Sequence, residues 1–261
     1  MDYTMYLMKA LTNMHVGGGD DTFGVVDKLV QRDPVTHYPT IYSSSLKGAL
    51  RENFKGKDFE NHVFGFQDNI SKNTIPGNYR FFPANLLALP ARSDIAPFFL
   101  VTSPAILQEF INTISVFKIE EKTVTEIELL KNLSHLQPEK DNALVNNRFS
   151  GKIEDWATGK NDTVPEESTL LGKYIALVSD EDFKKLSKNL PVIARNHLEN
   201  GQSANLWYEE IVPRETLFYF VVGLGTQYKN DFECAITEKN VQIGANASIG
   251  YGFTQISKIG G

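Results

Sequence analysis

The chain has little cysteine and no long apolar run. Cys234 is the single cysteine among 261 residues, so neither an internal disulfide nor a cysteine-based zinc site can form. No apolar stretch reaches the roughly 18 residues of a membrane helix. The first residues, Met-Asp-Tyr-Thr, lack the basic and apolar parts of a signal peptide. We therefore expect a cytoplasmic protein that binds no membrane.

The chain also lacks an excess of positive charge and two common cofactor motifs. The formal net charge of -6 argues against a free-standing, non-specific nucleic-acid binder, because neutralising phosphates needs many Lys and Arg on one face. An RNA partner would have to lie in a groove, within an assembly. Gly17-Gly18-Gly19 lacks the last glycine of a dinucleotide fingerprint, since position 22 is Thr, and no Gly-Lys pair has the spacing of a Walker A loop.

What remains is an ordinary globular composition, 41% hydrophobic and 22% charged, enough for one elaborated domain or two small ones. Residues 3–12 predict a strand that leads into a loop at His15. Ser103-Pro104 predicts the start of a core helix, with proline at its first position. Residues 118–168 are acidic and poor in apolar side chains, which predicts a surface insertion that is partly mobile, or else a docking surface.

The second half of the chain predicts shorter elements. Apolar strands are expected at 170–178 and 216–222, with a short helix after Asp180. Between them, residues 191–212 form two polar and aromatic runs around Asn200-Gly201, which is the strongest short-range signal for a β-hairpin. Its length and polar tip predict an arm that projects from the core.

The most informative stretch runs from residue 15 to residue 51. Glycines 17–19 lack a Cβ, so their backbone can approach a ligand closely. Ser43, Ser44 and Ser45 are expected to supply N-cap hydroxyls to a helix that begins near Leu46. A helix N-terminus with free N–H groups attracts phosphate, so this connection predicts an anion site.

That helix also carries a cationic edge. Lys47 and Arg51 lie one turn apart beside an inward stripe that contains Leu46 and Leu50. Residues 28–57 hold six Lys or Arg against two Asp or Glu, a local excess of four positive charges in an acidic chain. The basic character is local and indicates a site, although most such pairs of surface charges have no function.

Several motifs together resemble the RAMP superfamily of CRISPR effector proteins. The matching residues run from one end of the chain to the other: Val26-Asp27, Gln31-Arg32-Asp33, Tyr38-Pro39, Ser44-Ser45-Leu46-Lys47-Gly48-Ala49-Leu50-Arg51, and the glycine-rich segment from Gln242 to Gly252. Three more favour backbone subunit four of the type III-B Cmr complex over its type III-A sister: Leu86 to Ser93, Thr102-Ser103-Pro104, and Trp207-Tyr208-Glu209-Glu210 followed by Pro213. The sequence departs from the family pattern at Ser43, usually glycine, and at Tyr251, usually arginine, which removes one expected phosphate contact.

The resemblance implies a fold and an assembly. The fold is α+β, a single RAMP domain over residues 1–261 with a modified RRM/ferredoxin-like core at about 1–60 and 170–261. A helical insertion is implied at about 61–169, and a protruding β-hairpin thumb at about 191–212. The implied partners are CRISPR guide RNA, complementary target RNA, further copies of the chain in a helical filament, and other Cmr subunits.

The resemblance also implies an activity. Target RNA is cut at regular intervals, beside each thumb, by a loop acid that maps to Asp27, with a divalent metal for which Mg²⁺ is the first choice. The matching loop histidine is His15. Such cleavage is chemically reasonable, because a carboxylate can hold a metal against the phosphate or accept a proton from the attacking 2′-hydroxyl. Asp20 and Asp21 are near enough in sequence to assist, or are only turn residues.

Other residues are assigned supporting roles. Glu209, Glu210 and Tyr208 lie at the predicted base of the thumb, and strand alternation should send one glutamate inward and the other outward. Either glutamate could support the cleavage site, or both could form an exposed strand edge. RNA contacts are expected from Gly17, Gly18, Gly19, Gln31, Arg32, Ser43, Ser44, Ser45, Lys47, Arg51, Arg195, His197, Gly244 and Asn246.

Plainer interpretations stay open. Asp27 could only cap a turn, His15 could only hydrogen-bond its loop, and Arg195 and His197 could only pair with Glu209. At the level of the whole chain, the alternatives are a guide-RNA scaffold without cleavage, the type III-A sister subunit, and an interaction protein that binds no RNA.

Overall fold

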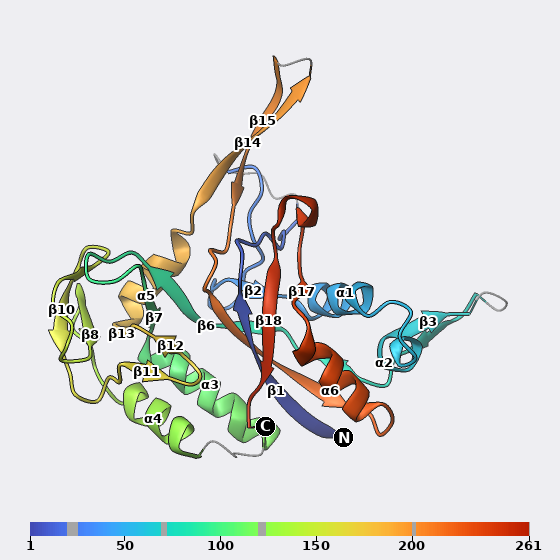
Figure 1. Ribbon diagram of the computed structural model, residues 1–261, viewed down its shortest axis with the longest axis horizontal. Helices are drawn as coiled ribbons and strands as arrows, with labels where there is room; N and C mark the ends of the chain where they lie inside the picture. Colours follow the sequence, from blue (N-terminus) through green and yellow to red (C-terminus); the bar gives the residue numbers. More distant parts are fainter. Residues whose placement is uncertain (20–25, 69–71, 120–123, 200–201, 261) are drawn as a thin grey trace.

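We describe residues 1–19, 26–68, 72–119, 124–199 and 202–260 of a computed structural model of the chain (Figure 1). Seven helices are described: α1 (Ser43–Asn53), α2 (Glu60–Phe64), α3 (Pro104–Phe117), α4 (Val124–Ser134), α5 (Asp180–Lys188), α6 (Lys229–Glu238) and the short 3₁₀ helix η1 (Ala247–Ile249). Within these ranges, no helix combines the length and the apolar character needed to cross a membrane.

Twelve strands form one large sheet. Its members are β1 (Asp2–Ala10), β2 (Thr40–Ile41), β5 (Arg80–Phe81), β6 (Ala84–Ala91), β7 (Phe99–Thr102), β8 (Asn142–Val145), β9 (Lys152–Ile153), β10 (Trp156–Lys160), β13 (Ile175–Val178), β16 (Leu217–Leu224), β17 (Val241–Gln242) and β18 (Phe253–Lys258). The order is β17-β18-β1-β16-β6-β7-β13-β8-β10-β9, with β2 beside β6 and β5 beside β16. The six remaining strands, β3 (Gly65–Gln67), β4 (Thr74–Pro76), β11 (Glu167–Ser168), β12 (Gly172–Lys173), β14 (Val192–Glu199) and β15 (Gln202–Glu210), pair in twos.

The centre of this sheet is built from four strands in the order β18-β1-β16-β6, and each neighbouring pair is antiparallel. In the chain, α1 follows β1 and precedes β6, while α6 follows β16 and precedes β18. Helices therefore alternate with strands of a mixed sheet, which confirms the predicted α+β class.

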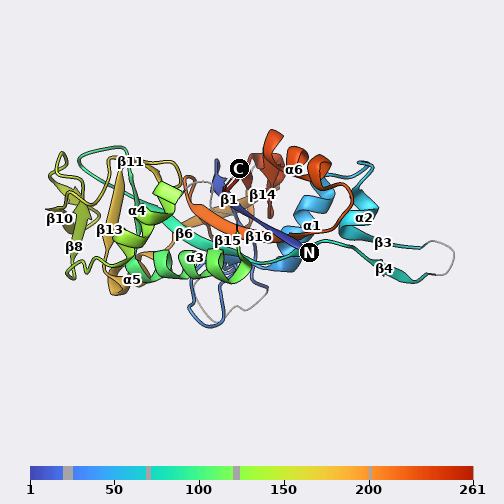
Figure 2. The same cartoon turned by 90° about the horizontal axis from the view of Figure 1, so that it is seen from below.

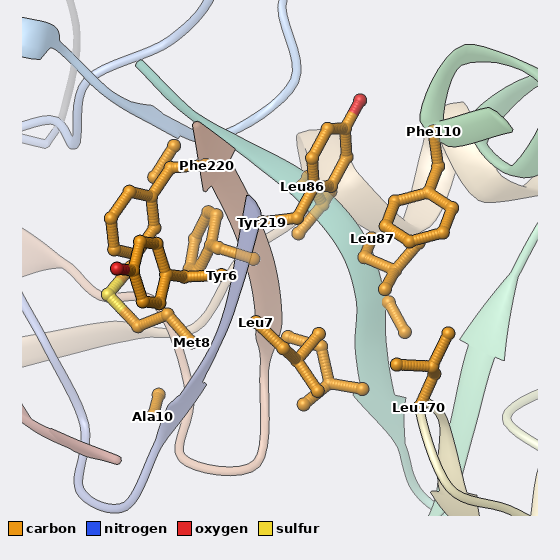
Figure 3. Close-up of a cluster of buried hydrophobic side chains, with 14 of the residues drawn as sticks. Tyr6, Leu7, Met8, Ala10, Leu86, Leu87, Phe110, Leu170, Tyr219 and Phe220 are labelled. Atoms are coloured by element: carbon orange, nitrogen blue, oxygen red, sulfur yellow. The ribbon is translucent and has the colours of Figure 1, made fainter. Parts of the chain in front are cut away.

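Both faces of the central strands are buried. Along β1, Met5, Tyr6 and Met8 are fully buried and Leu7 nearly so, although strand side chains alternate between faces. Figure 3 shows Tyr6 and Met8 on one side of the sheet with Phe220, and Leu7 on the other side. In Figure 2, α6 and α3 lie on opposite sides of β1 and β16. The sheet is therefore the middle layer of the molecule, which explains why residues 5–8 of β1 are apolar without alternation.

The best-defined sequence signals fold as predicted. Helix α3 begins at Pro104 after the extended Ser103, and its inward face buries Ile106, Leu107, Phe110, Ile111 and Ile114. The Phe110 ring meets the Tyr219 ring of β16 edge-on, with their centroids 5.0 Å apart. Helix α5 begins after Ser179, whose side chain accepts a hydrogen bond from the Asp182 N–H. Ser103, by contrast, makes no side-chain cap hydrogen bond, so the proline rather than a serine cap marks the start of α3.

The sequence predicted a surface insertion at 118–168. The described part of this stretch is instead packed against the rest of the protein. Helix α4 buries Ile127, Leu130 and Leu133, which follow helical spacing, and Trp156 is 8% exposed. Strands β8, β10 and β9 continue the large sheet beyond β13. The apolar residues are few, but most of the large ones are buried, among them Val145, Ile153 and Val164. Residues 61–169, predicted as a helical insertion, thus contribute strands β5 to β10 to the sheet as well as helices.

The predicted hairpin is confirmed. Strands β14 and β15 pair with each other in an antiparallel register that runs from Val192↔Glu210 to Glu199↔Gln202. Figure 1 shows this hairpin projecting away from the sheet, on the side opposite the two chain termini. Its predicted tip, Asn200-Gly201, lies outside the described residues.

Candidate active site at the base of the hairpin

The base of the hairpin is bonded to the segment that contains Asp27. The N–H groups of Asp27 and Lys28 both donate to the Tyr208 carbonyl, at 3.0 and 3.1 Å, and the Glu210 N–H donates to the Lys28 carbonyl at 2.9 Å. In return, the Tyr208 N–H donates to Oδ2 of Asp27 at 2.7 Å. Asp27 is exposed, so β15 fixes a solvent-facing carboxylate at the foot of the hairpin. It therefore does more than cap its own turn.

His15, in the loop after β1, is 4% exposed and contacts the end of the same hairpin strand, β15. Its Nδ1 is 2.8 Å from the Glu210 carbonyl oxygen and 3.4 Å from Oε1 of Glu209. A carbonyl oxygen only accepts, so Nδ1 carries a hydrogen. In a neutral ring Nε2 is then the acceptor, and a Cβ placed on Gly17 would lie 3.3 Å from it. A side chain at Gly17 would therefore crowd that nitrogen.

Glu209 joins three predicted site residues. Its Oε2 is 2.5 Å from Nε of Arg195, and its Oε1 accepts from Nδ2 of Asn246 at 2.8 Å. The Arg195 guanidinium also stacks over Tyr251, with its central carbon 4.5 Å from the ring centroid. Glu209 is 2% exposed, so this is a buried, charge-assisted network behind His15. The pairing that the sequence offered as the plain alternative for Arg195 is present.

Glu210 is also buried, at 5% exposure, and has its own partners. Its Oε1 is 2.6 Å from Nη2 of Arg32, and its Oε2 accepts from the Val30 N–H at 3.1 Å. Arg32 donates through Nη1 to the carbonyls of His37 and Ser187, both at 2.9 Å. The expectation of one outward glutamate, or of an exposed strand edge, is therefore wrong: alternation turns the two side chains apart, but each meets an arginine inside the protein.

Two residues of the hairpin stand apart from this network. His197 is exposed, and its Nε2 lies 3.7 Å from Oε1 of Glu199, so it does not pair with Glu209. Tyr208 exposes 40% of its surface and joins the site through its main chain. Lys28 lies over the ring of Trp207, 5.1 Å from the centroid, a contact that the sequence did not indicate.

A second set of predicted residues lines a hollow of about 600 Å³ between α1, the glycine loop and the C-terminal loop. Gln31 braces it, donating from Nε2 to the Gly17 carbonyl at 3.1 Å and to the Ser45 hydroxyl at 2.8 Å. Gly244 has φ +93°, and a Cβ there would collide with the His15 carbonyl oxygen. Gly18 and Gly19 are exposed nearby, and the Gly18 N–H donates to the Leu29 carbonyl.

The three serines do not cap α1 as predicted. The helix begins at Ser43, its N-cap is Tyr42, and that cap makes no side-chain hydrogen bond. Ser43, Ser44 and Ser45 occupy the first turn, where their hydroxyls lie beyond the capping position. The Ser45 hydroxyl instead accepts from Gln31, and Ser44 is exposed.

The cationic edge of α1 is extended by a residue that the sequence analysis missed. Burial lowers the pKa of Lys47, and so do the neighbouring positive charges of Arg51 and Arg80. Arg80 lies on β5, and its Nη1 donates to the carbonyls of Gly77 and Tyr79. Arg51 has an ion pair with Glu60 at 3.5 Å. No local pattern links Arg80 to α1, because the fold alone brings them together.

The predicted metal was tested against the donor set. Within the described ranges, no group of three or more His, Cys, Asp or Glu side chains could hold a metal ion. Asp27 offers one exposed carboxylate, and its Oδ2 already accepts from Tyr208. These side chains do not make a resident metal site by themselves. Asp20 and Asp21 lie outside the described residues.

Comparison with known proteins defines the class. The model of the RAMP superfamily matches residues 7–255, so the chain belongs to the RAMP superfamily. Within it, the chain is a homologue of Cmr4 of the type III-B Cmr complex. It is 28% identical to the Cmr endoribonuclease Cmr4 of Pyrococcus furiosus, over 95% of this chain and 92% of the relative. It is 25% identical to the CMR subunit Cmr4 of Saccharolobus solfataricus, over 96% and 94%.

Solved structures agree on the fold. A type III-B Cmr-beta complex bound to cognate target RNA contains a chain with a TM-score of 0.79 and 22% identity, covering 99% of this chain and 98% of that one. Oligomeric Cmr4 from Pyrococcus furiosus gives a TM-score of 0.67 and 21% identity over 99% and 98%.

Proposed function

We propose that the chain is the backbone subunit of a type III-B effector complex, that it holds guide RNA, and that it cleaves complementary target RNA at regular intervals. Membership of the RAMP superfamily and homology with Cmr4, one relative of which is named an endoribonuclease, support this proposal. Similar chains occur in a complex with target RNA and in oligomeric Cmr4, which supports RNA, further copies and other Cmr subunits as partners.

In this proposal the central strands are an RRM/ferredoxin-like core and the hairpin of β14 and β15 is the thumb. The order β18-β1-β16-β6, with α1 and α6 in the intervening connections, supports the first assignment. The separate two-stranded pairing of the hairpin and its projection from the sheet support the second. A projecting arm can separate the paired nucleobases of a guide–target duplex. The RNA backbone next to the foot of the hairpin is then free to change its conformation.

The observation that carries the proposed cleavage is the exposed Asp27 carboxylate, fixed by the Tyr208 N–H at the foot of the thumb. It accepts the proton of a target 2′-hydroxyl, whose oxygen attacks the adjacent phosphorus in line. The bond from phosphorus to the 5′-oxygen breaks, leaving a 2′,3′-cyclic phosphate and a 5′-hydroxyl. A positioned base of this kind contributes on the order of 10² to 10⁴ in rate.

His15 is the second group proposed for proton transfer. Its Nδ1–H is committed to the Glu210 carbonyl and faces Glu209, so Nε2 is the atom left to give a proton to the departing 5′-oxygen. To give that proton, the ring must carry a hydrogen on both nitrogens. The predicted Mg²⁺ stays a prediction, and the steps above use none.

The test is cleavage of end-labelled complementary RNA by the reconstituted, guide-loaded complex. Asp27→Asn keeps an oxygen that can accept from Tyr208 but removes the charge, and Asp27→Ala removes both. Both variants should lose the regularly spaced cuts while target binding stays unchanged. Asp155→Asn, at an exposed carboxylate in the strand-rich region after α4, is the matched control.

A guide-RNA scaffold without cleavage is the second function. It is favoured by the burial of His15, which is 4% exposed. Only Nε2 of its ring is then left to transfer a proton. No cutting by the wild-type complex would establish this alternative, and unaltered cutting by both Asp27 variants would move the cleavage away from this carboxylate. Co-purification with subunits of a type III-A complex would instead indicate the sister subunit.

A further inference from the structure

Lys28 follows the proposed base Asp27 directly in the chain and has no role in the proposed proton transfers. Its main chain is fixed to β15 at two points: the N–H donates to the Tyr208 carbonyl at 3.1 Å, and the carbonyl accepts from the Glu210 N–H at 2.9 Å. Lys28 forms a parallel β-bridge with Glu209 in this way. Its backbone is therefore held by the same strand that holds Asp27.

The Lys28 side chain lies on the aromatic ring of Trp207. Its Nζ is 5.1 Å from the ring centroid, and the residue is exposed. Within the described parts of the chain, no carboxylate forms an ion pair with Lys28, whereas the ammonium groups of Lys185 and Lys258 lie within 3.4 and 2.9 Å of glutamate oxygens. An ammonium that rests on an aromatic face keeps its N–H donors for another partner.

The Lys28 ammonium and the His15 ring lie against the same face of β15. Trp207 and Glu209 are two residues apart on this strand, so their side chains point to the same side. Lys28 contacts the first of them, and Nδ1 of His15 is 3.4 Å from Oε1 of the second. Oδ2 of Asp27 accepts from the N–H of the residue between them. Three consecutive residues of one strand therefore hold the proposed base, the proposed acid and an unpaired cation.

The proposed cleavage develops a charge that neither proton-transfer group balances. When the 2′-oxygen attacks, phosphorus acquires a fifth oxygen, and additional negative charge develops on the non-bridging oxygens. Asp27 is itself an anion, and His15 acts on the departing 5′-oxygen. A positive group that donates to a non-bridging oxygen lowers the energy of this state, because a charge-assisted hydrogen bond strengthens as the charge of its acceptor grows.

We propose that Lys28 is a catalytic residue whose ammonium donates to a non-bridging oxygen of the scissile phosphate during cleavage. Trp207 is a positioning residue, because its ring keeps the ammonium at the site before target RNA arrives. A cation–π contact at an exposed site is weak, so the phosphate can take the ammonium from the ring. No proton leaves Lys28, since the 2′-hydroxyl proton goes to Asp27 and the 5′-oxygen receives its proton from His15. The inference rests on the proposed function and adds a charge-stabilising group to it.

The test is single-turnover cleavage of end-labelled target RNA by the reconstituted, guide-loaded complex. Lys28→Met keeps the length of the side chain and removes its charge. It should lower the cleavage rate by a factor on the order of 10² to 10³, the usual effect of losing one such donor. Target binding and the unfolding midpoint should stay unchanged, which a purely structural role of Lys28 would not allow.

Two further variants complete this comparison. Lys28→Arg should recover most of the lost rate, because a guanidinium also stacks on an aromatic ring and donates to phosphate. Lys160→Met is the matched control, at another exposed lysine that has no ion pair among the described residues. It should cut at the wild-type rate.

A second substrate separates charge stabilisation from proton transfer. In an RNA whose 5′-bridging oxygen is replaced by sulfur at the scissile bond, the leaving thiolate needs no proton. The charge on the non-bridging oxygens still develops, so Lys28→Met should remain slow on this substrate. If the defect disappears there, Lys28 gives a proton to the leaving group, and the proposed role is wrong.

The remaining outcomes separate this inference from the proposed function. If the wild-type complex cuts, the Asp27 variants do not, and Lys28→Met cuts at the wild-type rate, then Lys28 has no part in cleavage while the proposed function stands. A loss of target binding as large as the loss of rate would make Lys28 a binding residue and would also overturn the inference. If the wild-type complex does not cut, the proposed function and this inference both fail.

Discussion

Nδ1 of His15 and the main-chain carbonyl of Glu210 lie 2.8 Å apart, although 195 residues separate them in the chain. This contact brings the loop after β1 against the end of the hairpin. It also fixes which edge of the imidazole faces the glycine loop, because Nδ1 must donate. The edge that carries Nε2 then depends on Gly17 for access.

Gly17→Ala should therefore reduce target cleavage with little loss of stability. The new methyl group would lie 3.3 Å from Nε2 of His15, close enough to crowd it, while the backbone at Gly17 needs no positive φ. Single-turnover cleavage by the reconstituted complex and a urea unfolding curve would measure the two effects. Cleavage at the wild-type rate would remove His15 from the chemistry.

Gly244→Ala gives the contrasting result. Gly244 has φ +93°, and an added Cβ would collide with the His15 carbonyl oxygen. We expect a loss of about 1–3 kcal/mol in the free energy of unfolding, the usual magnitude for a non-glycine residue held in such a conformation. An unfolding midpoint equal to that of the wild type would show that the C-terminal loop can move aside.

Glu209→Gln should destabilise the protein strongly. The carboxylate is 2% exposed and its Oε2 is 2.5 Å from Nε of Arg195, so the substitution leaves a largely buried guanidinium without its anion. Breaking a buried pair in this way costs about 3–5 kcal/mol. Denaturant unfolding of Glu209→Gln, Arg195→Gln and the double variant measures the coupling, which should make the double variant less damaged than the sum of the two. Simple additivity would contradict the network described above.

Arg32→Ala should act on the fold more than on RNA. Its guanidinium is engaged by Glu210 at 2.6 Å and by the carbonyls of His37 and Ser187, so its removal leaves the buried Glu210 carboxylate uncompensated. Arg51→Ala is the comparison, because that side chain is 45% exposed. We expect Arg32→Ala to lower the unfolding midpoint, and Arg51→Ala to lower RNA affinity with a nearly unchanged midpoint. The reverse pattern would restore Arg32 as a direct RNA contact.

Alkaline pH should destabilise the protein through buried tyrosines. Burial raises the pKa of Tyr79 and of Tyr219 to about 12, above the value of about 10 in an unfolded chain. Between these values the unfolded state has lost protons that the folded state keeps. Stability is therefore complete below pH 10 and falls as the pH rises towards 12.

Urea unfolding at several pH values between 9 and 11 would measure this slope. Tyr219→Phe should flatten it, because the phenylalanine ring can still pack against Phe110 without a group that titrates. Tyr208→Phe, at a tyrosine that exposes 40% of its surface, is the matched control and should leave the slope unchanged.

Local signals in the sequence were enough for several elements. The proline at position 104 marks the start of α3, and the two runs on either side of residues 200–201 pair as a hairpin, so both elements follow from short-range signals. The start of α1 was predicted three residues too late. Its N-cap is Tyr42, a residue type without capping preference, and the neighbouring serines were taken for the caps instead.

Long-range contacts could not be derived in this way. The Tyr208 N–H that holds Asp27 comes from 181 residues further along the chain, and Arg80 reaches α1 through the pairing of β5 with β16. The strand-rich region at 118–168 was misjudged because low apolar content hid the few side chains that point inward. The cytoplasmic location and the metal stay predictions of the sequence alone.

The hydrogen bonds between Asp27 and Tyr208 run in both directions, main chain to main chain and main chain to carboxylate. The acid is therefore bonded to the base of the hairpin through both its main chain and its side chain. In the proposed assembly, a tilt of the hairpin against an RNA duplex therefore also displaces the carboxylate. The dimensions of the protein then decide which phosphodiester bond is cut. The nucleotide sequence at that bond has no part in the choice.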